Sequence, residues 1–169
     1  MRSDDLVRSL EAAASAIPAL VAGLSDEEAR RPPAPDKWCV TEILAHLADE
    51  ERDDFRRRVA LTLEDPTRAW PPIDPEGWAR ERDYRSRHLA DVLDDFRTER
   101  AASLSWLRSL RAAPWERAYE HPQLGTLRAG DLLAAWAAHD LLHLRQLAST
   151  RLALVQAAAE PFSTRYAMP

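Results

Sequence analysis

His139 and His143 lie four residues apart in the segment WAAHDLLHLRQL, residues 136–147, and His46 lies far upstream. Residues four apart on a helix project from one face, about 6 Å apart along its axis, so two imidazoles at this spacing can bind one metal ion. A third histidine from a neighbouring helix would give three protein ligands and an open position, which is typical of catalytic rather than structural metal sites. The residue types and spacing therefore favour metal chemistry inside a helical protein.

Two aspartates accompany the histidines. At about 100° per residue, Asp140 falls within the apolar arc that holds His139 and His143. A carboxylate on such an arc needs a partner, and the sequence leaves two open: the second N–H of a metal-bound imidazole, or a buried arginine. Asp49 follows His46 by three residues, where it either accepts from a metal-bound water, extends the ligand set or belongs to a solvated acidic face.

We therefore take His46, His139 and His143 as candidate metal ligands, and Asp49 and Asp140 as candidate catalytic residues that orient a ligand or accept a proton. The alternative is structural, because a histidine on an apolar helical face is often an ordinary core or rim residue. His88 and His121 are expected to be surface groups, at a helix start and in a loop.

Composition limits the class of protein. The 169 residues are expected to form one domain, residues 1–169, because nothing in the chain resembles a long flexible linker. A formal net charge of −5 and the lack of a basic helical stripe argue against nucleic acid as a partner. The first five residues are polar and no apolar run approaches about 20 residues, so we expect a cytoplasmic protein without a membrane span. The single cysteine, Cys39, cannot form an internal disulfide.

Apolar residues at helical spacing predict four long helices, over about residues 4–23, 40–63, 86–111 and 127–155. Pro18 falls inside the first, so a bend or break near Ala16 is expected from the missing backbone donor. Cys39 and Glu42 occupy capping-box positions at the second helix, and Thr126 is the predicted cap of the fourth. Four such helices are most simply an all-α antiparallel bundle.

The connections are less regular. Prolines and a glycine in residues 70–78 predict a loop. Residues 115–127 contain His121-Pro122 and Gly125, and are expected to form a loop with room for a small hairpin. Tryptophans 38, 106 and 136 are expected to anchor the core, with Trp136 one turn from His139.

The segments KWCVTEILAHL (37–47), LGTL (124–127) and WAAHDLLHLRQL (136–147) resemble the DinB-like, or YfiT-like, metal-dependent bacterial proteins. The resemblance covers most of the chain, with Cys39 at a position where serine is more usual. It implies an up-down-down-up four-helix bundle, often dimeric, with a divalent metal held by three histidines that match His46, His139 and His143. That order keeps the second and third helices parallel across a long crossover, which suits residues 65–85.

The resemblance also implies an activity. Members include thiol S-transferases and a thiol-dependent isomerase, and by similarity the metal would activate a thiol or a water by stabilising its anion. We expect a metal-dependent transferase or hydrolase acting on a small molecule, with zinc or nickel bound and, for a transferase, a low-molecular-weight thiol. A homodimer is expected. The alternative is a non-catalytic, stress-related binding or scaffold protein whose metal is structural or residual.

Overall fold

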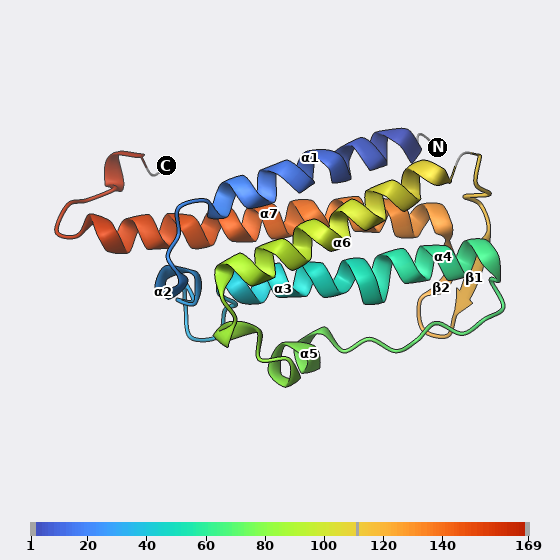
Figure 1. Ribbon diagram of the computed structural model, residues 1–169, viewed down its shortest axis with the longest axis horizontal. Coiled ribbons are helices and arrows are strands. Elements are labelled where there is room, and N and C mark those ends of the chain that lie inside the picture. The colour runs from blue at the N-terminus through green and yellow to red at the C-terminus, as the bar shows by residue number, and fades with distance from the viewer. Residues whose placement is uncertain (1–2, 111, 168–169) are drawn as a thin grey trace.

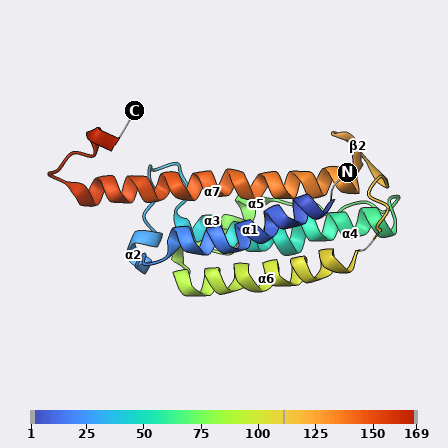
Figure 2. The same ribbon diagram turned by 90° about the horizontal axis from the view of Figure 1, so that it is seen from above.

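Four helical rods lie side by side in the computed structural model, which describes residues 3–110 and 112–167 (Figures 1 and 2). The second rod is continuous but contains a π-helical turn, η1. In chain order the rods are α1 (Ser3–Val21), then α3 (Val40–Asp49) with η1 (Glu50–Phe55) and α4 (Arg56–Glu64), then α6 (Leu89–Ser109), and last α7 (Ala129–Ala159).

The rods have the predicted order of directions. α1 and α7 run one way, and the α3–α4 rod and α6 run the other way, as the colours show in both views (Figures 1 and 2). α1 packs along α7, and α3 packs along α6. The fold is therefore the up-down-down-up four-helix bundle that the family resemblance implies.

Short elements make the connections. The chain from α4 returns along the bundle so that α6 can begin beside α3 (Figure 1). These elements are α2 (Asp26–Ala29), α5 (Pro75–Glu81), the 3-10 turn η2 (Tyr84–Ser86), and the strands β1 (Ala118–His121) and β2 (Gly125–Arg128). A further 3-10 turn, η3 (Arg165–Ala167), follows α7. Within the described residues, no helix combines the length and apolarity needed to cross a membrane.

The predicted hairpin is present. β1 and β2 pair antiparallel, with Ala118 opposite Arg128 and His121 opposite Gly125. Gly125 has a φ of +73°, a left-handed conformation that glycine adopts without strain. The turn before it is held by the Nδ1 atom of His121, which accepts from the backbone N–H groups of Gln123 and Leu124 at 3.2 Å each.

Two helix details differ from expectation. Of the bend or break expected near Ala16, the break is absent, and α1 continues through Pro18 to Val21, because proline at this point removes one hydrogen bond near the helix end. Thr126 is not the cap of α7. It lies in β2, and the helix instead begins after Arg128, whose backbone N–H donates to the Asp131 carboxylate at 3.0 Å.

An ion network joins all four rods. Arg100 of α6 is 1% exposed, and it donates to Glu51 of η1 at 2.6 and 3.0 Å and to Asp140 of α7 at 2.6 and 2.8 Å. It also donates to the backbone carbonyl of Leu10 in α1 at 3.0 Å. The indole N–H of Trp136 completes the network by donating to Glu51 at 2.7 Å. Burial raises the pKa of both carboxyls, and the Arg100 charge opposes that rise.

Replacing Arg100 by methionine should leave two carboxyls buried without their cation. We expect Arg100→Met to lower the free energy of unfolding by about 3–5 kcal/mol, measured by urea denaturation at pH 7. The matched change at the exposed Arg97 should alter it by less than about 0.5 kcal/mol. An Arg100→Met protein as stable as the Arg97→Met protein would show that the network does not hold the rods together.

The same variant should respond to pH. Without Arg100 the pKa values of Glu51 and Asp140 rise further, so the folded chain holds protons that the unfolded chain releases. The Arg100→Met protein should therefore lose stability as the pH rises from about 5 to 8, and do so more steeply than the unchanged protein.

Candidate metal centre

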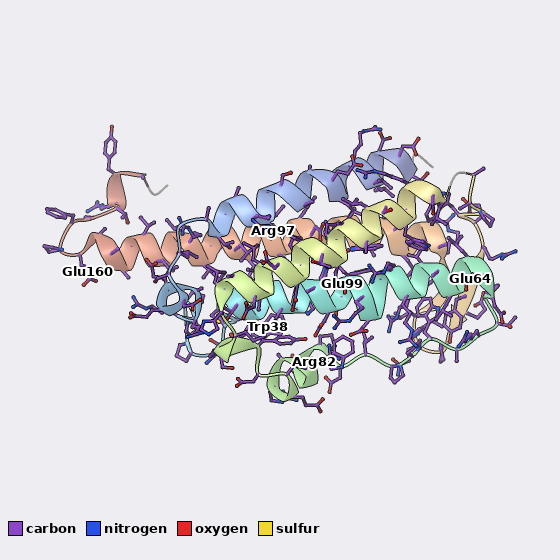
Figure 3. All side chains as sticks on the ribbon, viewed as in Figure 1. Trp38, Glu64, Arg82, Arg97, Glu99 and Glu160 are labelled. Atoms are coloured by element: carbon purple, nitrogen blue, oxygen red, sulfur yellow. The ribbon has the colours of Figure 1, made fainter. Side chains whose placement is uncertain are left out.

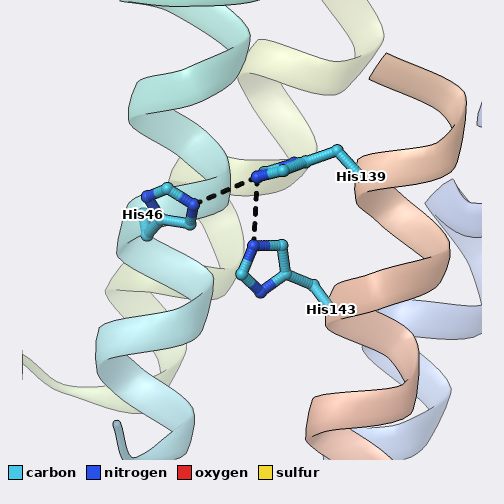
Figure 4. A group of neighbouring side chains, drawn as sticks. All are labelled: His46, His139 and His143. Atoms are coloured by element: carbon cyan, nitrogen blue, oxygen red, sulfur yellow. Dashed lines mark hydrogen bonds between the residues drawn. The ribbon is translucent and has the colours of Figure 1, made fainter. Parts of the chain in front are cut away.

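Three imidazoles meet between α3 and α7 (Figure 4). The Nε2 atom of His139 lies 3.3 Å from Nε2 of His46 and 3.1 Å from Nε2 of His143. One ligand atom from each ring lies within 4.8 Å of the others. Leucines from both helices, including Leu47 and Leu147, share a core cluster that keeps α3 beside α7. The convergence expected from the sequence is therefore present.

Burial keeps these imidazoles neutral. His46 is 6% exposed, and its burial, with the neighbouring rings of His143 and His139, lowers its pKa to about 3. Burial also lowers the pKa of His139 to about 3, and it lowers that of His143, where the Gln146 contact opposes it. Neutral imidazoles retain the nitrogen lone pair that a metal ion requires.

The arrangement fits a divalent metal ion. Two nitrogens bound to one tetrahedral zinc ion lie about 3.3 Å apart, as follows from a zinc–nitrogen bond of about 2.0–2.1 Å. The two short separations in the cluster, 3.1 and 3.3 Å, match this value. A set of imidazole nitrogens suits zinc, nickel, copper or iron rather than magnesium or calcium. His46, His139 and His143 are thus suited to hold such an ion.

Two polar side chains lie near the Nδ1 atoms of the ligand rings. Gln146 accepts through Oε1 from Nδ1 of His143 at 2.8 Å, which places the proton on Nδ1 and leaves Nε2 free for a metal. Glu50 lies with Oε1 3.7 Å from Nδ1 of His46, beyond hydrogen-bond distance. Burial, together with the nearby Asp54, raises the pKa of Glu50 to about 9. Sequence reasoning missed the contact of Gln146 with His143, although its spacing of three residues from that histidine was a usable signal.

Aromatic rings surround the cluster. The centroid of Trp38 lies 5.0 Å from that of His46, edge on, and that of Phe55 lies 5.1 Å from that of His139. Phe55 in turn stacks on Trp136 at 5.6 Å, and Trp136 is 1% exposed, as expected for a core anchor. These rings limit the access of water to the histidines and lower the local dielectric.

The π-helical turn lies directly after the histidine-bearing part of α3. A π turn inserts one extra residue into an α-helix and changes which side chains face inward beyond it. Here Glu51 reaches Arg100, and Phe55 reaches the ring of His139. A uniform helical projection over residues 40–63 did not predict either contact.

The two candidate catalytic aspartates contact other groups. Asp140 forms the buried ion pair with Arg100, which is one of the two partners that the sequence left open. Asp49 accepts from Arg52 at 2.5 Å, and also from Arg82 and the Tyr84 hydroxyl. Both carboxylates are therefore engaged by donors beside the cluster, and their catalytic roles stay predictions.

Comparison with known proteins identifies the family. Residues 9–147 match the family model of the DinB superfamily, so the chain belongs to that superfamily. It is 31% identical over 118 residues to an inferred metal-dependent hydrolase of Oceanobacillus iheyensis, a match that covers 66% of this chain and 64% of that protein. It is 23% identical over 150 residues to YfiT of Bacillus subtilis, also an inferred metal-dependent hydrolase, with 86% and 84% covered.

A solved structure of Bacillus subtilis YfiT supports the fold. It matches with a TM-score of 0.77 at 21% sequence identity, over 88% of this chain and 85% of that chain. That protein is described as having an unusual four-helix bundle topology. All three clustered histidines of the present chain lie within the segment that the superfamily model matches.

Removing the acceptor on His143 should weaken metal binding. Gln146→Leu keeps the side-chain volume but loses the contact with Nδ1, so the ring can adopt the wrong tautomer or orientation. We expect a zinc affinity about 10–100-fold lower, measured by competition with a chromophoric chelator. Gln123→Leu, in the hairpin, is the control and should bind zinc normally. Equal affinity in both variants would exclude a role for Gln146 in holding the ligand.

Proposed function

We propose that this protein is a metal-dependent hydrolase of small molecules. The observation that carries the proposal is the meeting of three neutral imidazole nitrogens from two helices, a set of three candidate ligands among residues 3–110 and 112–167. Three ligands leave a coordination position for water or substrate, whereas a structural zinc site usually has four. The inferred activities of the relatives support the same class of reaction.

The chain supplies distinct parts of such a site. His46, His139 and His143 would hold the ion, and a zinc or nickel ion bound there would supply Lewis acidity toward a water and a substrate carbonyl. Gln146 keeps the proton of His143 on Nδ1. Trp38 and Phe55 shield the ligand rings from bulk water. Arg100, through Asp140 and Glu51, holds the two histidine-bearing segments against each other.

Asp49 and Asp140 enter the proposal as positioning residues. Asp140 follows His139 directly in the chain, so its ion pair with Arg100 fixes the backbone that carries one ligand. Asp49 lies three residues after His46 in the chain, and it forms ion pairs with Arg52 and Arg82. In this assignment neither carboxylate has to accept a proton from the substrate, and both act by holding the helix surfaces that present the imidazoles.

Metal content is the first test. Protein purified without a histidine tag and then dialysed against zinc should retain about one ion per chain, because three imidazoles converge. His139→Ala should lose it, since two ligands remain. His121→Ala, in the hairpin, is the control and should retain the ion. Equal trace metal in all three proteins, by inductively coupled plasma mass spectrometry, would refute the metal site.

Activity is the second test, and it separates hydrolysis from thiol transfer. The zinc- or nickel-loaded protein should release 4-nitrophenol from 4-nitrophenyl esters, with one water consumed per ester. His139→Ala should be slower by about a hundredfold or more, because Lewis acidity contributes several kcal/mol to such reactions. Consumption of a low-molecular-weight thiol with a chloroarene, without ester hydrolysis, would instead assign the S-transferase activity that the family resemblance allows. A scaffold protein would show neither reaction.

A further inference from the structure

We propose that the cleft beside His143 selects small anionic molecules with an apolar body, through Lys37 and Arg145. The inference rests on the proposed function, because the cleft would be the substrate side of the same site.

The cleft lies between the segment before α3 and the middle of α7. Its volume is about 530 Å³, within the range of about 300–1,000 Å³ that is usual for small-molecule sites. Trp38 and Leu142 supply apolar surface, and His143 forms part of the lining. Figure 3 shows Trp38 beside the start of α3.

The cleft adjoins the histidine cluster. His143 belongs to both, and Gln146, which fixes its tautomer, also lines the cleft. The Trp38 wall packs edge on against His46 at 5.0 Å, and the His46 and His143 rings lie 4.8 Å apart. A molecule in the cleft therefore contacts the residues that hold and shield the ligand nitrogens.

The charge of the lining is opposite to that of the chain. Among the residues that the structure describes, the lining contains two cationic side chains, Lys37 and Arg145, and no carboxylate, although the chain carries a net charge of −5. Lys37 lies 3.3 Å from the Asp36 carboxylate, but both side chains are more than half exposed, so water screens this pair strongly. The cleft is thus a local cationic surface on an acidic protein.

The hydroxyl groups in the lining do not compete for the same role. Ser149 donates to the backbone carbonyl of Arg145, and Thr150 donates to that of Gln146. Both hydroxyl groups already donate their protons to backbone carbonyls of α7. Recognition of an anionic group therefore depends on Lys37 and Arg145. A guanidinium binds a carboxylate or phosphate through two parallel donors, and an ammonium adds a compact charge.

A second cleft offers a contrast. It has a similar volume, about 480 Å³, and lies between α1 and the end of α6. Its lining mixes Asp4 and Glu11 with Arg8 and Arg108, and Arg8 and Arg108 form ion pairs with acidic residues of α1. The cleft at the histidines differs from this second cleft because its two cations share the lining with none of the acidic residues that pair with Arg8 and Arg108.

Binding of two matched probes tests the proposal. 3-Phenylpropionate and 3-phenylpropan-1-ol have the same apolar body and no hydrolysable bond, so their affinities, measured by NMR titration of the zinc-treated protein, do not depend on hydrolysis. We expect the carboxylate to bind about tenfold more tightly, because each exposed ion pair contributes up to about fivefold. The preference should shrink at about 1 M salt, where the Debye length is about 3 Å.

Three variants decide where the preference arises. Lys37→Gln and Arg145→Gln should each reduce it several-fold, and the double variant should abolish it. Arg97→Gln, on α6 (Figure 3) and not part of the cleft lining, is the control and should leave the preference unchanged. Melting temperatures verify the fold, which these exposed substitutions should not disturb.

His139→Ala separates this proposal from the proposed function. It removes a candidate metal ligand but keeps both cations, so the carboxylate preference should persist even if no metal or hydrolysis is found. Equal affinity for the two probes in the unchanged protein would overturn the proposal. So would a preference that disappears in His139→Ala and survives in Arg145→Gln, because the carboxylate would then bind at the histidines.

Discussion

The buried contact of Arg100 with Glu51 and Asp140 is the interaction on which the rest of the structure depends. One guanidinium reaches the η1 turn, α7 and a backbone carbonyl of α1. Asp140 is next to His139 in sequence, and Glu51 lies in the π-helical turn that follows α3. The contact that joins the rods therefore also fixes how far apart the histidine-bearing segments lie. A buried ion pair contributes little net stability over apolar packing, so we interpret its value as setting the alignment of the helices.

Charge is distributed unevenly around the histidines. On the inner side lie buried carboxyl groups, including Glu50 and Asp54, whose pKa values burial raises. A divalent cation held by neutral imidazoles would favour their ionised forms and be stabilised by them. On the outer side, the described part of the cleft lining has two cations and no carboxylate. This asymmetry suits a site that keeps a metal ion on one side and admits an anionic molecule from the other.

Much of this arrangement follows from local pattern in the sequence. The four helices and the face shared by His139 and His143 depend on helical periodicity, and the hairpin depends on Gly125, so each could be predicted without tertiary information. The pairing of α3 with α7, which brings in His46, was supplied by the family resemblance. The π turn could not be predicted, because residues 50–58 contain a single apolar side chain, Phe55, and the shift that an inserted residue causes in the apolar pattern cannot be read there. The turn determines which acidic residues face inward. The partner of Asp140 is Arg100, forty residues away in the chain, so helical periodicity could not identify it.

The central claim is that three imidazoles hold one metal ion that retains an open position. Anomalous diffraction from crystals of the zinc- or nickel-loaded protein, recorded on both sides of the metal absorption edge, tests it most directly. The account predicts one peak within about 2.0–2.2 Å of an Nε2 atom from each of His46, His139 and His143, with no further protein ligand. A peak elsewhere, a fourth protein ligand, or no peak in protein that binds metal in solution would contradict it.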